Sequence, residues 1–162
     1  TRKNSLSVSD TGEFQFLYPG PLCDEELTAV LVARHPADLL KGWAPSYEFE
    51  LRLEGGSEHV GTVNFRAGNN HLIEMYCGHF GYSVEAKWRG RHFAERGMRL
   101  ILPFARQHGL FTIWITCNPD NWPSRRTCER LGAELIDIVP LPVDNDMYLR
   151  GEREKCRYRL DL

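Results

Sequence analysis

One stretch of the chain decides the fold: residues 81–94, which read Gly81-Tyr-Ser-Val-Glu-Ala-Lys-Trp-Arg-Gly-Arg-His-Phe-Ala94. The pattern predicts a strand that ends near Val84, a short basic turn, and a long helix that begins around Arg91. The first turn of a helix offers unpaired N–H groups and the positive end of the helix dipole. Together with Arg89 and Arg91, these N–H groups favour a binding site for a phosphate or pyrophosphate. The alternative is that this turn only connects the strand to the helix and happens to be basic. It contains neither a P-loop nor a Gly-x-Gly-x-x-Gly motif.

Downstream of this turn, helix and strand patterns alternate. In order they predict a helix over 91–108, a strand over 111–117, a helix from its cap residue Asn121 to Gly132, and a strand over 133–139. Pro103 lies inside the first helix, where a proline removes one backbone hydrogen bond and is expected to kink it. The strand 111–117 is almost continuously apolar, which is typical of a strand covered on both faces.

The rest of the chain shows mainly strand patterns. Upstream, we predict an opening strand at 14–18, a helix from 24 to 34, a short helical piece at 37–42, and strands at 47–54, 59–67, 72–76 and 78–84. Downstream, a loop covers 140–146, residues 147–150 begin a hairpin that turns at Gly151, and the last strand is 156–162. These elements predict a mixed α/β sheet with helices on its faces.

Length and composition set outer limits on the class of protein. The chain has 162 residues, which predicts a single domain over 1–162, and 42% of them are hydrophobic. No apolar run approaches the roughly 18 residues that cross a bilayer, and no secretory signal is visible. Five scattered cysteines argue against a disulfide framework and favour the cytoplasm. The six histidines show no metal-binding spacing.

Charge is distributed unevenly along the chain. The segment from Lys87 to Arg130 holds nine basic and three acidic residues, whereas the remainder carries a net charge of −8. A basic middle on an acidic body favours a compact polyanionic ligand over long nucleic acid. The alternatives are a solvated basic helix face or, less in keeping with the acidic remainder, a nucleic-acid-binding protein.

Two motifs together resemble a known family. The chain reads Val84-x4-Arg89-Gly90-Arg91-His92-Phe93-Ala94 and, after the next strand, Asn121-x-x-Ser124-x3-Cys128-Glu129-Arg130-Leu131-Gly132. In order and spacing these motifs resemble the GNAT superfamily of acyl-CoA-dependent N-acyltransferases. The resemblance implies a mostly antiparallel sheet of about six or seven strands with a splayed centre and helices on both faces. It also implies transfer of an acetyl group from acetyl-CoA to a primary amine by direct attack. A non-catalytic acyl-CoA-binding module is the alternative.

The resemblance also implies which residues bind coenzyme A. The backbone of the turn from Arg89 to Ala94 would hold the pyrophosphate, and the preceding strand would pair with the pantetheine arm. The implied set is Tyr82, Val84, Arg89, Gly90, Arg91, His92, Phe93, Ala94, Asn121, Ser124 and Arg125, with Arg126 as the alternative to Arg125. Asn121 is equally explained as a helix cap.

Two positions depart from the family pattern. His92 replaces a glycine, so its side chain crowds the pyrophosphate or lies beside it, and we expect the turn to avoid positive backbone angles. Cys128 replaces the tyrosine that in many members protonates the departing thiolate. A thiol is able to donate that proton at neutral pH, and packing inside the helix is the alternative role.

The attacking amine must lose a proton, so a base near the strand ends is wanted. Candidates are Glu74, His79 and Glu85, and His79 is preferred because strand alternation places it on one face with Gly81 and Ser83. A histidine satisfied by a backbone carbonyl is the alternative. The expected partner is a small-molecule or peptide amine, without nucleic acid, membrane or metal, and a homodimer is left open. The resemblance places the acceptor pocket at 23–43 and 140–153.

Overall fold

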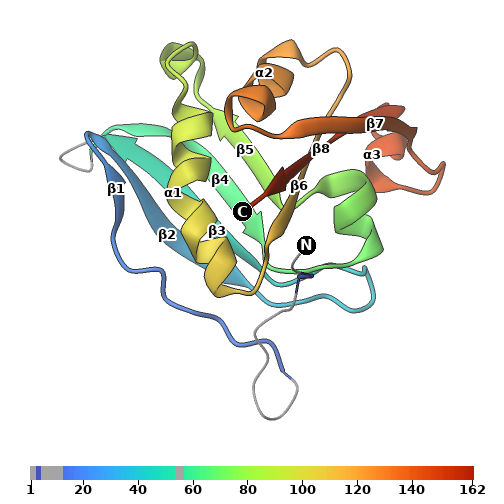
Figure 1. Cartoon of the computed structure of the whole chain (residues 1–162), viewed down its shortest axis with the longest axis horizontal. Coiled ribbons are helices and arrows are strands. Elements are labelled where there is room, and N and C mark those ends of the chain that lie inside the picture. Colours follow the sequence, from blue (N-terminus) through green and yellow to red (C-terminus); the bar gives the residue numbers. More distant parts are fainter. Residues whose placement is uncertain (1–2, 5–12, 54–56) are drawn as a thin grey trace.

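The computed structural model describes residues 3–4, 13–53 and 57–162 (Figure 1). Over these residues the elements are, in chain order, β1 (Leu22–Asp24), β2 (Leu27–His35), β3 (Ser46–Leu53), β4 (His59–Arg66), a π-helical segment η1 (Ile73–Cys77), β5 (Phe80–Val84), a 3-10 turn η2 (Ala86–Trp88), α1 (Phe93–Gln107), β6 (Thr112–Cys117), α2 (Trp122–Arg130), β7 (Glu134–Pro140), α3 (Asp146–Leu149) and β8 (Glu154–Asp161).

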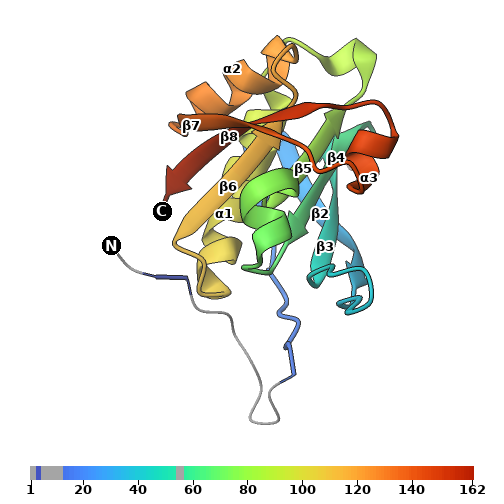
Figure 2. The ribbon, with the colours of Figure 1, turned by 90° about the vertical axis from the view of Figure 1, so that its right-hand side faces the viewer.

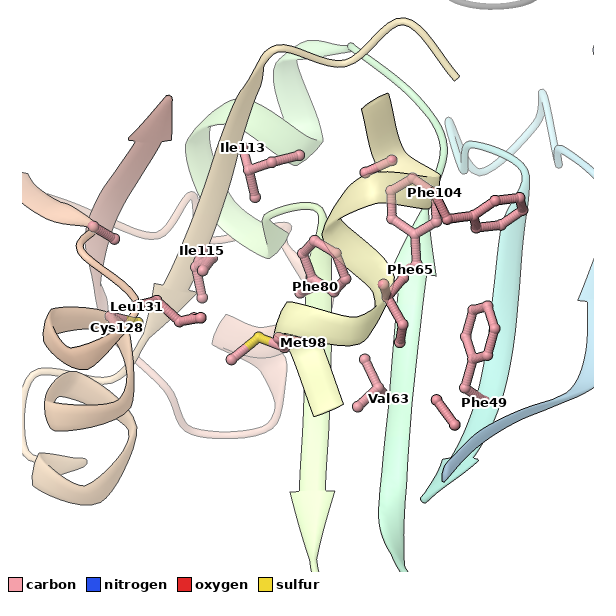
Figure 3. Packing of buried hydrophobic residues seen from close by; sticks show 14 of the residues in the cluster. Phe49, Val63, Phe65, Phe80, Met98, Phe104, Ile113, Ile115, Cys128 and Leu131 are labelled. Carbon is pink, nitrogen blue, oxygen red and sulfur yellow. The ribbon is translucent and has the colours of Figure 1, made fainter. Parts of the chain in front are cut away.

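The strands form two antiparallel sheets, one in the order β1-β2-β3-β4-β5 and one in the order β6-β8-β7. The sheets touch where the start of β5 meets the middle of β6, since the N–H of His79 donates to the carbonyl of Trp114 at 2.7 Å. A Cβ added at Gly78 would lie 2.8 Å from the same carbonyl oxygen, so the backbones are in close contact there. Beyond this point β5 and β6 run in the same direction and diverge (Figure 3). The predicted mixed α/β fold with a splayed centre is confirmed, with eight strands over the described residues.

One hydrophobic core joins the two sheets. Helix α1 packs across β1, β2, β4 and β5, and α2 lies beside it against β6 (Figures 1 and 2). Phe104 of α1 packs edge-on against Tyr47, whose ring stacks on Phe65. A Cβ at Gly97 would lie 2.6 Å from a methyl of Leu51, so glycine is what allows α1 to lie this close to the sheet.

The N-terminal part of the chain differs from its sequence prediction. The helix expected from 24 to 34 is wrong: β1 and β2 form a hairpin there, with Leu22 opposite Ala29. Leu27 and Ala29 are buried on one face of β2, because β3 supplies a partner along its whole length. Two further predictions are also wrong, since residues 37–42 form a turn closed by Asp38 and Trp43, and residues 14–18 form no strand.

Two other segments change type. The strand predicted at 72–76 is wrong, because Asn70 starts the helical segment η1 by accepting the N–H groups of Ile73 and Glu74. Residues 147–149 belong to α3 rather than to the start of a hairpin, and β8 pairs with β6 and β7 instead. The remaining strands and both longer helices lie where predicted, including Pro103 inside α1.

The β1–β2 turn allows a test of backbone strain. Glu25 has φ +49°, a left-handed conformation that costs a non-glycine residue about 1 kcal/mol or more. Replacing the exposed Glu25 by Gly is expected to raise the free energy of unfolding by about 0.5–1 kcal/mol in a denaturant titration, after the extra entropy of glycine is subtracted. Glu25→Ala is the control and should show no gain; a loss with glycine would contradict the interpretation.

Candidate active site

The split between the sheets opens into a cleft of about 830 Å³ that reaches the first turn of α1. One wall is β5 with the following turn, and the other is the end of β6 with α2. Nine of the eleven predicted coenzyme A residues line this cleft, and Arg91 and Arg125 do not. The nine are Tyr82, Val84, Arg89, Gly90, His92, Phe93, Ala94, Asn121 and Ser124.

The turn before α1 has an unusual backbone. Gly90 has φ +81° and His92 has φ +61°, so the expectation that this turn avoids positive angles is wrong. Histidine is among the residues that enter the left-handed region more readily. The His92 side chain makes no capping hydrogen bond, and the first N–H groups of an α-helix have no acceptor within the helix. The cleft therefore ends at a helix start that is able to bind an anion.

Three arginines line this end of the cleft: Arg89, Arg126 and Arg130. The predicted Arg91 instead lies over the ring of Trp88, at 5.2 Å from its centroid. The predicted Arg125 donates to the hydroxyl of Tyr158 and to the carbonyl of Pro119, so it ties α2 to β8. Sequence reasoning missed Arg130, although its spacing of four residues from Arg126 places both on one face of a helix.

The tyrosine of β5 reaches across the split to α2. The hydroxyl of Tyr82 lies 2.5 Å from Oγ of Ser124, and burial, with the neighbouring Cys128, raises the pKa of Tyr82. Cys128 itself is fully buried and lies outside the lining of the cleft. Its hydrogen bond with the thiol of Cys117, together with burial, raises its pKa. This placement favours the packing role of Cys128 over the role of proton donor.

His79 lies beside the cleft but is completely buried. Its Nε2 bonds to the carbonyl of Gly68 at 3.0 Å, and its Nδ1 accepts the N–H of Trp114 at 2.9 Å. Nδ1 accepts a hydrogen bond only when it is unprotonated, and burial lowers the pKa of His79 to about 4. The ring thus joins the start of β5 to β6, which favours the structural alternative over the role of base.

The other two candidate bases also lie outside the cleft. Glu74 is part of η1, and Glu85 pairs with Nδ1 of His59 at 2.7 Å. The carboxylate that does line the cleft is Glu152, which no local motif marks, although it falls in the segment 140–153 assigned to the acceptor pocket. The sequence pattern did not single out Glu152, because only the fold brings it to the cleft.

Glu152 belongs to a small polar network. Nζ of Lys155 lies 2.9 Å from Oε1 of Glu152 and 2.7 Å from Oδ1 of Asn118. Burial alone would raise the pKa of Glu152, but the hydrogen bonds from Lys155 and Asn118 outweigh it and the pKa is lowered. Within the described ranges, no group of three or more metal-ligating side chains occurs, and no helix is long and apolar enough to cross a membrane.

A sheet that splits beside a helix start, with arginines around that start, defines a protein that binds an extended anionic ligand between its two halves. The chain belongs to the acetyltransferase (GNAT) domain family, whose model matches residues 6–134. The family suggested by the two motifs is therefore confirmed. No curated protein matches the sequence.

Solved structures share the fold at low sequence identity. RimL, a ribosomal L7/L12 α-N-protein acetyltransferase in complex with coenzyme A, has 10% identity over 88% of this chain and 98% of its own, with a TM-score of 0.63. The Vibrio fischeri ribosomal-protein-S5-alanine acetyltransferase has 17% identity over 72% of this chain and 61% of its own, with a TM-score of 0.57. The microcin C7 self-immunity acetyltransferase MccE, with acetyl-CoA and AMP, has 18% identity over 72% and 61%, with a TM-score of 0.55. This chain thus spans about three fifths of the last two.

Proposed function

We propose that the protein transfers an acetyl group from acetyl-CoA to a primary amine by direct attack. The observation that carries this proposal is the cleft between β5 and β6, which ends at the start of α1 among three arginines. A pyrophosphate suits the amides of residues 89–94, and Arg126 and Arg130 are placed for the remaining phosphate oxygens. Solved structures of the same fold hold coenzyme A or acetyl-CoA, which supports the choice of donor.

Among the hydroxyl groups that line the cleft, we assign that of Tyr82 to the leaving sulfur. Acetyl-CoA supplies a thioester, whose C–S bond breaks as the amine nitrogen bonds to the carbonyl carbon, and the thiol leaves with a proton. Tyr82 is protonated because its pKa is raised, so its O–H is able to donate a hydrogen bond to the sulfur as negative charge develops. We therefore assign to Tyr82 the part that Cys128 was expected to play.

We assign Glu152 to the attraction of the acceptor amine. Its lowered pKa makes it a weak base but a stable anion, so it attracts an ammonium group to the cleft. The proton that the amine must lose passes to water. The alternative function, a non-catalytic acyl-CoA-binding module, is favoured by one observation only, the buried position of Cys128.

Replacing Tyr82 by Phe tests the proposal. The wild-type protein is expected to release thiol from acetyl-CoA when amines are supplied, and Tyr82→Phe is expected to lower kcat about tenfold, since a hydrogen bond to a charged group contributes about 1.5–3 kcal/mol. The dissociation constant of coenzyme A, measured by calorimetry, should stay within about twofold because the ring remains.

Tyr18→Phe is the matched control, because that side chain is 77% exposed and lies outside the cleft. Coenzyme A binding without thiol release for any amine would replace the enzyme by the binding module. An unchanged kcat in Tyr82→Phe would remove Tyr82 from the mechanism. The single domain, the cytoplasmic location, the homodimer and the lack of nucleic-acid and membrane partners all stay predictions.

A further inference from the structure

The cleft carries charges that the donor does not explain. Besides the three arginines at the start of α1, its lining includes Arg66, Glu152 and Lys155. Glu152 and Lys155 pair with each other. Across residues 3–4, 13–53 and 57–162, no carboxylate lies within ion-pair distance of Arg66. Among the residues that the structure describes, this part of the cleft therefore has one positive charge without a counter-ion.

Arg66 is held in place by backbone groups. Its Nη1 donates to the carbonyls of Cys77 and Gly78 at 3.1 and 3.2 Å. A Cβ added at Gly81 would lie 3.6 Å from Nη2 and 3.8 Å from Nη1, so the guanidinium lies directly over a residue without a side chain. Because both hydrogen bonds use Nη1, the Nη2 side of the guanidinium is left for a ligand.

This guanidinium lies on the far side of β5 from Tyr82. Gly81 alternates with Phe80 and Tyr82, whose side chains pack toward α1 and the core. The thiol of Cys77, which also lines the cleft, is close enough to both Arg66 and Lys155 to feel their charges. Arg66 and the Glu152–Lys155 pair thus line the same cleft, and Cys77 lies near both cations.

We propose that the acceptor is a small amine that carries an anionic group, a carboxylate or a phosphate, which Arg66 binds while Glu152 attracts the amine. A guanidinium binds carboxylate and phosphate oxygens in pairs, and an unpaired charge in a half-buried site is stabilised when an anion arrives. This inference rests on the proposed function and adds the class of acceptor to it.

Matched acceptors test the inference with the full chain. Thiol release from acetyl-CoA is measured with glycine, β-alanine and γ-aminobutyrate against their amides, and with phosphoethanolamine against ethanolamine. We expect kcat/KM at least tenfold higher for the preferred acid than for its amide. An amino-acid amide is the less basic amine and is more often unprotonated, so reactivity alone predicts the opposite order. The carboxylate and phosphate arms distinguish the two anions.

Variants of Arg66 assign the preference to this residue. In Arg66→Met the ratio between acid and amide should fall to about one, and in Arg66→Lys it should fall less, while coenzyme A affinity stays unchanged. Arg34→Met, which removes an exposed arginine outside the cleft, is the control. If Arg66→Met fails to fold, the ratio of kcat/KM between acid and amide in the wild-type protein still tests the proposed acceptor class.

The possible results have different consequences for the acceptor class and for the proposed function. Equal or better turnover of the amides, or of a neutral peptide, overturns the acceptor class but leaves the acetyltransferase proposal standing. If the ratio of kcat/KM between acid and amide stays unchanged in both Arg66 variants, the proposed role of Arg66 in binding the acceptor is also overturned. No thiol release with any acceptor refutes the proposed function, and the inference fails with it.

Discussion

Replacing His79 by Leu is expected to lower the free energy of unfolding at pH 7 by about 3 kcal/mol or more. The side chain satisfies the carbonyl of Gly68 and the N–H of Trp114, and each buried group left unpaired costs about 1–3 kcal/mol. Because these bonds join β5 to β6, the loss falls on the junction of the two sheets. Denaturant titration measures it directly.

The same variant should change how stability depends on pH. The pKa of His79 is about 4 in the folded chain, against about 6.5 when unfolded, because burial disfavours the charged ring. Between these values the unfolded chain binds a proton that the folded chain does not, so stability is complete above about pH 6.5 and falls as pH drops to 4. The loss amounts to about 3 kcal/mol, and His79→Leu should remove it.

Two other histidines matter for this experiment: one adds acid sensitivity of its own, and the other provides a control variant. His108 is also buried, and its pKa is lowered to about 4, so part of the acid sensitivity should persist in His79→Leu. His71 is exposed, and His71→Gln is the control that should leave the free energy of unfolding at pH 7 unchanged. A stable His79→Leu protein with a large loss of kcat would restore His79 as the base.

Replacing Arg126 by Ala is expected to weaken coenzyme A binding about tenfold or more, with little change in stability. Arg126 is exposed and lines the cleft, and a charge-assisted hydrogen bond to phosphate contributes about 1.5–3 kcal/mol. Calorimetry at two salt concentrations should show a weaker salt dependence than in the wild type, because one cation fewer meets the phosphates.

The neighbouring residue is the matched control. Arg125→Ala should leave coenzyme A affinity within about twofold but lower the free energy of unfolding by about 1 kcal/mol, since it loses the bonds to Tyr158 and Pro119. If Arg125→Ala weakens binding and Arg126→Ala does not, the phosphate end of the cleft is assigned wrongly.

Local sequence patterns correctly predicted the helices and strands for which all local signals indicate the same type of element. The alternation through β3, the capping of α2 by Asn121 and the apolar stripe of α1 each point to one structure, and each is found. The segment from 24 to 34 carries both a helical start and a strand-like alternation. Its pairing with β3 selects the strand, because a sheet neighbour satisfies the backbone of β2 along its whole length.

The candidate site likewise combines features that a local sequence pattern predicts with features that only the tertiary structure reveals. The order and spacing of the motifs predicted the strand, turn and helix start that line the cleft, since the start of a helix after a strand is a local feature. Choosing between Arg125 and Arg126 was beyond a local pattern, because only β8 shows which of them is occupied elsewhere. The roles of His79 and Cys128 changed for the same reason, as their partners come from distant parts of the chain.

The amino-acid sequence alone was enough to predict the strand, the turn and the helix start that line the cleft, and to suggest the family. Only the tertiary structure decided which side chains reach the cleft: it buried His79 and Cys128, and it brought Arg66 and Glu152 to one place. The physical reason is that backbone amides at a helix start are set by neighbours in sequence, whereas burial and charge pairing depend on residues that only the fold brings together.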